Sequence, residues 1–225
     1  MKREARRCYE ARGAPVLRRA GAIDKRGFYE LNTRFDGPRR CPGASDTPCN
    51  RSGVDREPNP NDRPEDTSMP IREGDRAPDF SLKGTAGDQP IELAQYRGDK
   101  NVVLLFFPLA WTSVCTSEMC SIRDSYARYR EIDAEVLGIS VDSPFALAAW
   151  AKEEGFAFPL LSDFNREAAR SYDVLYEDLM GLQGVAKRAA FVVDREGIVR
   201  YAEVCPTPAQ LPDFGKIQQA LRAAG

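Results

Sequence analysis

The residues that could do chemistry gather in one short stretch, FFPLAWTSVCTSEMC, at positions 106–120. Pro108 stands four residues before Thr112, Thr112 three before Cys115, and Cys120 five after Cys115. In one interpretation these residues are structural: a strand end, a helix N-cap, and buried or disulfide-bonded cysteines. In the other, Cys115 is a nucleophile, because the thiolate is the reactive form of cysteine. The joint spacing of Pro108, Thr112 and Cys115 favours the second interpretation.

The composition limits which chemistry is available. None of the 225 residues is a histidine, which removes the usual proton shuttle at neutral pH and the commonest metal ligand. Histidine-based triads and His-ligated zinc or haem are therefore excluded. The formal net charge of −2 predicts binding neither to nucleic acid nor to a membrane surface. No run of 18 apolar residues suggests a membrane span.

The cysteines are too sparse for the disulfide framework of a small secreted protein. They are Cys8, Cys41, Cys49, Cys115, Cys120 and Cys205. Residues 1–30 carry charges throughout and lack the apolar core of a secretory signal, so we expect a cytoplasmic protein. Cys41 and Cys49 have no neighbouring CxxC and give only a weak indication of a zinc site.

Residues 1–68 differ in composition from the remainder. They carry 15 Lys and Arg side chains, 13 of them Arg, against 11 Asp and Glu. The segment from Gly37 to Ser68 has many Pro and Gly residues and no apolar period, so we expect a disordered or loosely structured extension. An Arg-rich transit peptide is disfavoured by the acidic residues interspersed in the first 36 positions. A true start at Met69 is an alternative. The predicted domain covers residues 69–225.

A regular alternation of strands and helices begins near residue 70. The apolar runs at 101–107 and 135–142 predict strands buried on both faces. The spacing at 117–132 predicts a helix, and Ser143, Pro144 and Gly155 predict a second helix with its N-cap, first residue and end.

The later segments complete the pattern. We expect a strand at 158–163, a helix at 165–174, two strands joined by a turn at 194–197, and a last helix at 214–224. This order predicts a three-layer α/β fold with a mixed central sheet.

The elements explain how Cys115 could be activated. Active sites in open α/β sheets lie beyond the carboxyl ends of strands, where Pro108 should end the first buried strand. With a helix beginning near Thr112 or Ser113, Cys115 falls in the first turn. There free N–H groups and the helix dipole stabilise an anion. Thr112 shares that face and could offer its hydroxyl towards the sulfur or a substrate oxygen. Pro108 would form a rigid wall that shields the site from water.

The motif P-x-x-x-T-x-x-C resembles the active-site signature of the peroxiredoxins. GDRAPDFSL, GISVDSPFALAAWA, FPLLSDF and KRAAFVVDREGIVRYAE are also similar to family segments, in the expected order, so the resemblance covers about residues 70–225. It implies a thioredoxin-like fold and a thiol peroxidase that needs neither a metal nor an organic cofactor.

The resemblance also implies roles for individual residues. Cys115 matches the peroxidatic cysteine, Thr112 and Pro108 the pocket residues, and Arg188 the arginine beside the sulfur. A guanidinium favours thiolate over thiol and can bind the peroxide oxygens. Glu118 is at the position of an acid that would orient this arginine, although a solvated first-turn glutamate is an alternative.

The thiol that resolves the resulting sulfenic acid is open at this point. C-x-x-x-x-C, ending at Cys120, resembles the bacterioferritin-comigratory (peroxiredoxin Q) group, whereas FFPLAWTSVC resembles the one-cysteine alkyl hydroperoxide reductase E group. Five helical residues rotate about 140° and separate two Cα atoms by roughly 8–9 Å, so a bond from Cys115 to Cys120 requires unwinding. Cys205, which we expect at an exposed position before Pro206, is the rival resolver.

Two other functions use the same cysteine. A thioredoxin-type disulfide oxidoreductase would need C-x-x-C, which is missing. A redox sensor that passes oxidation to a partner is the other alternative. For a peroxidase, the implied partners are peroxide substrates and a reductant such as thioredoxin, a glutaredoxin-like protein or a low-molecular-weight thiol. The resemblance implies a monomer or a homodimer.

Overall fold

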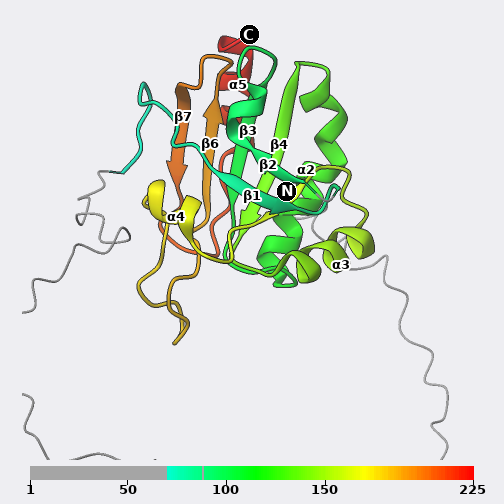
Figure 1. Ribbon diagram of the computed structural model, residues 1–225, viewed down its shortest axis with the longest axis vertical. Coiled ribbons are helices and arrows are strands. Elements are labelled where there is room, and N and C mark those ends of the chain that lie inside the picture. The colour runs from blue at the N-terminus through cyan, green and yellow to red at the C-terminus, as the bar shows by residue number, and fades with distance from the viewer. Residues whose placement is uncertain (1–69, 88) are drawn as a thin grey trace, which may run out of the picture. The chain divides into compact units, whose positions relative to one another are not determined.

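The computed structural model describes residues 70–87 and 89–225 (Figure 1). The extension predicted for residues 1–68, with Cys8, Cys41 and Cys49, lies outside the described residues. No helix in the described part is long and apolar enough to cross a bilayer.

The described residues form one mixed sheet in the order β2-β1-β5-β4-β3-β6-β7. The central strand β3 is parallel to β4 and antiparallel to β6. The bounds are β1 Ser81–Gly84, β2 Pro90–Glu92, β3 Asn101–Phe106, β4 Ala134–Ser140, β5 Leu160–Ser162, β6 Ala189–Val193 and β7 Val199–Val204. The predicted buried strands and the turn at 194–197, closed by the Gly197 N–H on the Asp194 carbonyl, are confirmed.

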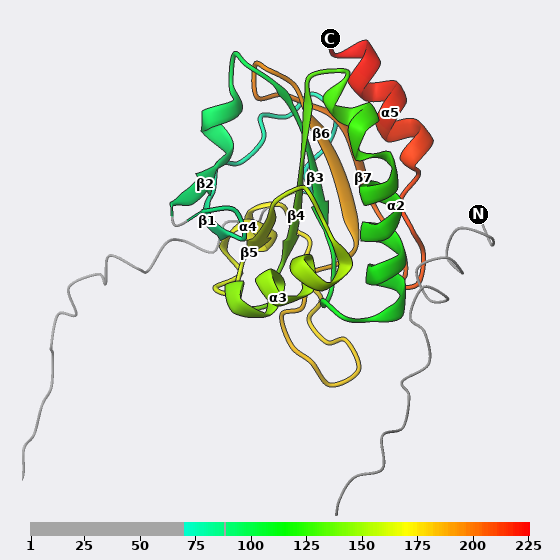
Figure 2. The same cartoon turned by 90° about the vertical axis from the view of Figure 1, so that its right-hand side faces the viewer.

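Helices cover both faces of this sheet, which confirms the predicted three layers. They are α2 Ser113–Arg130, α3 Pro144–Glu154, α4 Glu167–Ser171 and α5 Phe214–Ala223, with a short 3-10 helix η1 at Leu93–Tyr96. Alternate residues of β3 point to opposite faces. Val103 and Leu105 contribute to the core under α2, α3 and α5, whereas Leu104 and Phe106 contribute to the core under α4 and η1. Figure 2 shows α2 and α5 on the same side of the sheet.

Helix α3 begins and ends where its sequence predicts. The Ser143 side chain accepts a hydrogen bond from the Ala146 N–H, Pro144 occupies the first turn, and Gly155 ends the helix in the left-handed conformation. The helix expected at 165–174 is shorter, because α4 ends at Ser171.

The β1–β2 hairpin was not predicted from the sequence. Its strands have only four and three residues, and β1 ends in Lys83 and Gly84, which are poor strand formers. Each strand is too short to display a period, and pairing of β1 with β5 holds it in the sheet.

Candidate active site

Cys115 lies at the corner between β3 and α2, as predicted. Thr112 is the N-cap in an extended conformation, and α2 begins at Ser113, which places Cys115 in the first helical turn. Its side chain is only 1% exposed, and Pro108 is buried beside the strand end. The first-turn N–H groups have no partner within the helix and stabilise negative charge at this end.

The hydroxyl of Thr112 is oriented differently from the sequence expectation. It donates a hydrogen bond to the Leu109 carbonyl at 3.0 Å. Its hydrogen is therefore not directed at the Cys115 sulfur, and its oxygen keeps lone pairs that can accept a hydrogen bond. The backbone turn of residues 109–112 explains the difference, because it brings the Leu109 carbonyl within reach of the side chain.

Arg188 brings a buried positive charge to the Cys115 sulfur. It directly precedes β6, and the register pairs Ala189 with Phe106, so Arg188 lies at the carboxyl end of β3. Its side chain is 1% exposed, and its Nη2 atom lies 3.3 Å from the Cys115 Sγ atom. A guanidinium at this distance favours the thiolate, because it stays charged and donates to the sulfur.

Glu118 is buried and holds Arg188 by an ion pair from its Oε2 atom to Nη1. The solvated-glutamate interpretation is therefore wrong. Burial raises the pKa of Glu118 to about 7, although the positive charge of Arg188 acts in the opposite direction. Burial also lowers the pKa of Arg188, but the negative groups Glu118 and Cys115 outweigh it, and the net direction is upward.

A backbone carbonyl completes the surroundings of Arg188, and sequence reasoning missed it. The Pro208 oxygen accepts hydrogen bonds from Nη2 at 2.9 Å and from Nε at 3.2 Å. These contacts fix the plane of the guanidinium. A backbone acceptor leaves no signal in residue types, so nothing in CPTPAQ could have identified it.

Cys205 is buried, which corrects the expectation of an exposed cysteine. It is a free thiol with 2% exposure, and its N–H donates to the Arg188 carbonyl at 2.8 Å. The β6–β7 register, extended by one pair, sets Cys205 opposite Arg188 on the same face of the sheet. Burial raises the pKa of Cys205 to about 11, and the carboxylates of Glu203 and Glu118 add to this effect against Arg188.

Cys120 does not share the surroundings of Cys115. Its side chain is 3% exposed, and its sulfur lies 3.8 Å from the Oε2 atom of Glu154, at the end of α3. Cys115 is a free thiol in a continuous helix, so the two cysteines are not bonded to each other. The structure thus brings together Cys115, Glu118 and Arg188, and leaves Cys120 facing another helix.

The loop before α2 is anchored to the neighbouring strand. Trp111 has a φ of 67° and is 47% exposed. The preceding N–H, of Ala110, donates to the Asp142 Oδ2 atom at 2.8 Å. Sequence reasoning did not identify Asp142, which lies 32 residues away, although strands 101–107 and 135–142 were both predicted.

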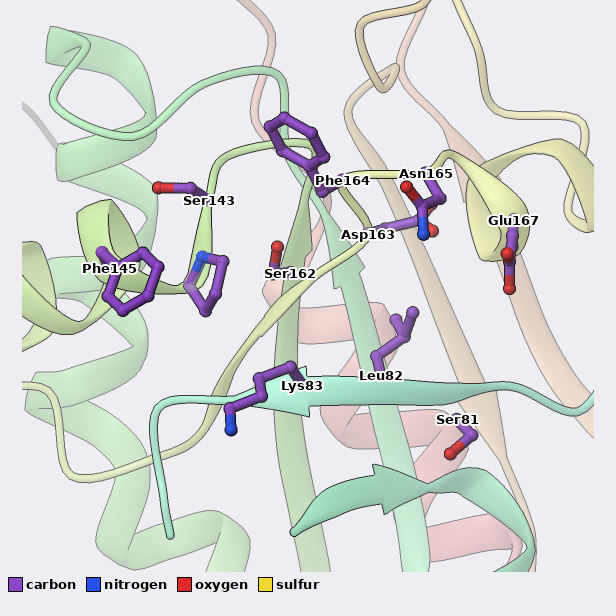
Figure 3. A pocket seen from close by; sticks show the side chains of 11 residues that line it. Ser81, Leu82, Lys83, Ser143, Phe145, Ser162, Asp163, Phe164, Asn165 and Glu167 are labelled. Carbon is purple, nitrogen blue, oxygen red and sulfur yellow. The ribbon is translucent and has the colours of Figure 1, made fainter. Parts of the chain in front are cut away.

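A cavity of about 420 Å³ lies between β1, the start of α3 and the β5–α4 connection (Figure 3). Its lining includes the exposed rings of Phe145 and Phe164, with Ser162 among them. None of its lining residues is a cysteine. This cavity is therefore separate from the cluster of Cys115, Glu118 and Arg188.

Comparison with known proteins agrees with this geometry. The AhpC/TSA family matches residues 73–202. Alkyl hydroperoxide reductase E of Mycobacterium tuberculosis is 44% identical over 152 residues, which cover 67% of this chain and 95% of that protein. A chloroplastic 2-cysteine peroxiredoxin of Chattonella marina var. antiqua is 40% identical, covering 60% of this chain and 72% of that protein.

Solved structures give the same result. The reduced 2-Cys peroxiredoxin of Plasmodium vivax superimposes with a TM-score of 0.61 at 32% identity, covering 68% of this chain and 82% of that chain. Peroxidoxin BcpB from Mycobacterium tuberculosis has a TM-score of 0.60 at 33% identity, covering 68% and 97%. The predicted thioredoxin-like fold is confirmed by these neighbours.

Proposed function

The chain belongs to the AhpC/TSA family and is a peroxiredoxin, a thiol-dependent peroxidase, and from this premise we propose that Cys115 is the sulfur that reacts with peroxide. Arg188 and Glu118 lie beside it, and Pro108 and Thr112 precede it on the loop that leads into α2. The contact between Arg188 Nη2 and Cys115 Sγ is the single observation that carries this assignment.

In the proposed reaction the Cys115 thiolate attacks one oxygen of hydrogen peroxide or an organic hydroperoxide. A sulfur–oxygen bond forms and the oxygen–oxygen bond breaks, with its electron pair leaving on the second oxygen. The leaving oxygen takes a proton and departs as water or alcohol, and the cysteine becomes a sulfenic acid. Arg188 stabilises the charge that develops on the leaving oxygen, and the reaction uses no cofactor.

Glu118 and Pro208 act on this reaction through Arg188. Nη1 donates to the Glu118 carboxylate, and Nε and Nη2 donate to the Pro208 carbonyl, which holds the guanidinium with Nη2 also facing the Cys115 sulfur. A cation held in place before the reaction does not have to reorganise as charge moves from sulfur to oxygen.

Stopped-flow fluorescence tests the assignment of Cys115. Trp111 is partly exposed four residues from Cys115, so oxidation should change its emission within the first turnover. Mixing the reduced protein with hydrogen peroxide should give this change and a sulfenic acid at position 115. Cys115→Ser should abolish peroxide consumption, and the matched variant Cys205→Ser should keep it. Full-speed consumption by Cys115→Ser would falsify the assignment.

We further propose that Cys120 resolves the sulfenic acid. In protein whose cysteines have all been reduced, the Cys120 thiol would attack the oxidised Cys115 sulfur, forming a disulfide and releasing water. Because the two residues lie about 140° apart on α2, the first turns must unwind during this step. A thioredoxin, a glutaredoxin-like protein or a low-molecular-weight thiol would then reduce the disulfide, in the cytoplasm.

Mass mapping of the peroxide-treated protein tests the resolving step. We expect a bond from Cys115 to Cys120, together with lower hydrogen-exchange protection of residues 113–122 in the oxidised protein. Cys120→Ser should spare the first oxidation and slow turnover. A bond to Cys205, or only sulfenic acid and mixed disulfides, would contradict the role of Cys120 and leave that of Cys115 intact.

A further inference from the structure

The loop that leads into α2 adopts a conformation that needs external support. Trp111 has a φ of 67°, in the left-handed region, which costs free energy for a residue with a side chain. It lies directly before the N-cap Thr112. Any relaxation of Trp111 would therefore shift the start of α2, and with it the first-turn N–H groups around Cys115.

The support comes from the neighbouring strand. Asp142 follows β4, which is parallel to β3, so the carboxyl ends of the two strands lie side by side. The Asp142 Oδ2 atom accepts the Ala110 N–H at 2.8 Å, and Ala110 is 6% exposed. A carboxylate acceptor makes this bond stronger than one between neutral groups.

Asp142 is itself held by two buried serines. The Ser140 hydroxyl donates to the same Oδ2 atom at 2.8 Å, and the Ser162 hydroxyl donates to the Asp142 carbonyl at 2.6 Å. Ser140 is at the end of β4 and Ser162 at the end of β5. These bonds link the ends of β4 and β5 to the loop that follows β3. Figure 3 shows the Ser162 side chain in the lining of the cavity.

We propose that Asp142 is a positioning residue for Cys115. By holding the Ala110 N–H it fixes the loop of residues 108–112, and so keeps Thr112 and the start of α2 where the Cys115 thiolate is stabilised. The inference rests on the proposed function, because positioning matters only if Cys115 reacts. The hydrogen bonds of Asp142 go to Ala110, Ser140 and Ser162, and we assign it no contact with the reacting atoms, so it is a positioning residue and not a catalytic one.

The test compares Asp142→Ala with Asp142→Asn, and with Ser143→Ala as the matched control. The alanine variant loses the acceptor, whereas asparagine keeps an oxygen that can accept the Ala110 N–H. Ser143→Ala removes the N-cap bond of α3 next to Asp142 and leaves the Ala110 bond in place. Each variant is first checked for folding by circular dichroism and urea unfolding.

Three readouts are measured on each variant. In Asp142→Ala the rate of Cys115 oxidation by hydrogen peroxide should fall about tenfold to a hundredfold. The rate at which iodoacetamide alkylates Cys115 at a fixed pH of about 8 should fall, and hydrogen exchange of the Ala110 amide should accelerate. Asp142→Asn should restore most of the rate, and Ser143→Ala should resemble the wild-type protein in all three.

Unchanged rates of alkylation and oxidation in folded Asp142→Ala would overturn the proposal, and so would an equal loss in Ser143→Ala. If Asp142→Ala does not fold, Ser140→Ala takes its place with an expected loss of about threefold, and wild-type behaviour of that variant overturns the proposal. Alkylation and amide exchange require no peroxide. They therefore test the role of Asp142 even if the wild-type protein fails to reduce peroxide.

Discussion

Cys115 and Cys205 are both buried, free thiols, and both lie beside Arg188, yet their surroundings differ. Cys115 meets the guanidinium itself and lies in the first turn of α2. Cys205 meets the backbone of the same arginine, at the end of a strand and within the influence of Glu203 and Glu118. Burial raises the pKa of Cys205 to about 11, so this thiol stays protonated at neutral pH.

Burial of a thiol and its placement beside positive charge have opposite effects on the thiolate. Removing a thiol from water by itself disfavours the thiolate and makes the cysteine inert. A helix N-terminus and a directed guanidinium oppose that penalty, and only Cys115 has both. We therefore expect the reactivity of each buried sulfur to depend on whether it faces the guanidinium of Arg188 or only the backbone of that residue.

The largest expected effect is selective alkylation of the two thiols. With a pKa of about 11, only about one Cys205 side chain in a thousand is a thiolate at pH 8. Iodoacetamide at pH 8 should therefore label Cys115 in the folded, reduced protein and leave Cys205 almost unlabelled, as measured by peptide mass spectrometry. In urea both should react at similar rates. Equal labelling in the folded protein would show that Cys115 and Cys205 do not differ in reactivity.

The next effect concerns the guanidinium. Arg188→Met keeps much of the side-chain volume but removes the charge and the hydrogen-bond donors. We expect the rate of Cys115 oxidation by hydrogen peroxide to fall about 10²–10³-fold, while Cys205 stays unlabelled at pH 8. Arg200→Met, which removes a half-exposed arginine paired with Asp194, is the matched control and should keep the wild-type rate. Comparable losses in both variants would show that the position of Arg188 is unimportant.

The smallest effect is on the pH dependence of stability and comes from Glu118. Its folded-state pKa of about 7 lies above its ordinary value of 4.5, so the folded protein binds this proton more tightly than the unfolded chain. Glu118 alone therefore makes the free energy of unfolding fall as the pH rises from about 4.5 to about 7. Urea unfolding of Glu118→Gln should show a shallower fall over this range, by about 1–3 kcal/mol.

Glu131→Gln is the control for this titration, because Glu131 is exposed at the end of α2. Its stability should follow the wild-type pH dependence. An unchanged slope in Glu118→Gln would mean that Glu118 stays ionised throughout this range, fully compensated by Arg188.

The sequence predicted those parts of the fold that repeat a pattern. The strand at 101–107 is an uninterrupted apolar run, and α3 has both its N-cap Ser143 and its terminal Gly155, so local rules were sufficient. The β1–β2 hairpin was missed because its few residues carry no period. The burial of Cys205 was missed because it depends on the register of β7 against β6, which sequence spacing does not specify.

The residues of the site likewise fall into those that local sequence could predict and those that it could not. The spacing of Thr112 and Cys115 is local, so the helix start could be predicted from it, and the resemblance supplied Arg188. The contacts of Arg188 with the Pro208 carbonyl and of Asp142 with Ala110 join segments distant in the chain through backbone atoms. Backbone groups are the same in every residue, so only the folded structure could reveal these two contacts.

The hydrogen bond from Thr112 to the Leu109 carbonyl determines what this hydroxyl can offer to a bound molecule. The hydroxyl has used its only hydrogen, and Arg188 offers donors alone, so the two groups present opposite requirements to an incoming molecule. A hydroperoxide carries both a terminal hydrogen that the Thr112 oxygen could accept and oxygen atoms that the guanidinium could bind. A dialkyl peroxide has no such hydrogen, so we expect the protein to reduce dialkyl peroxides more slowly than hydroperoxides.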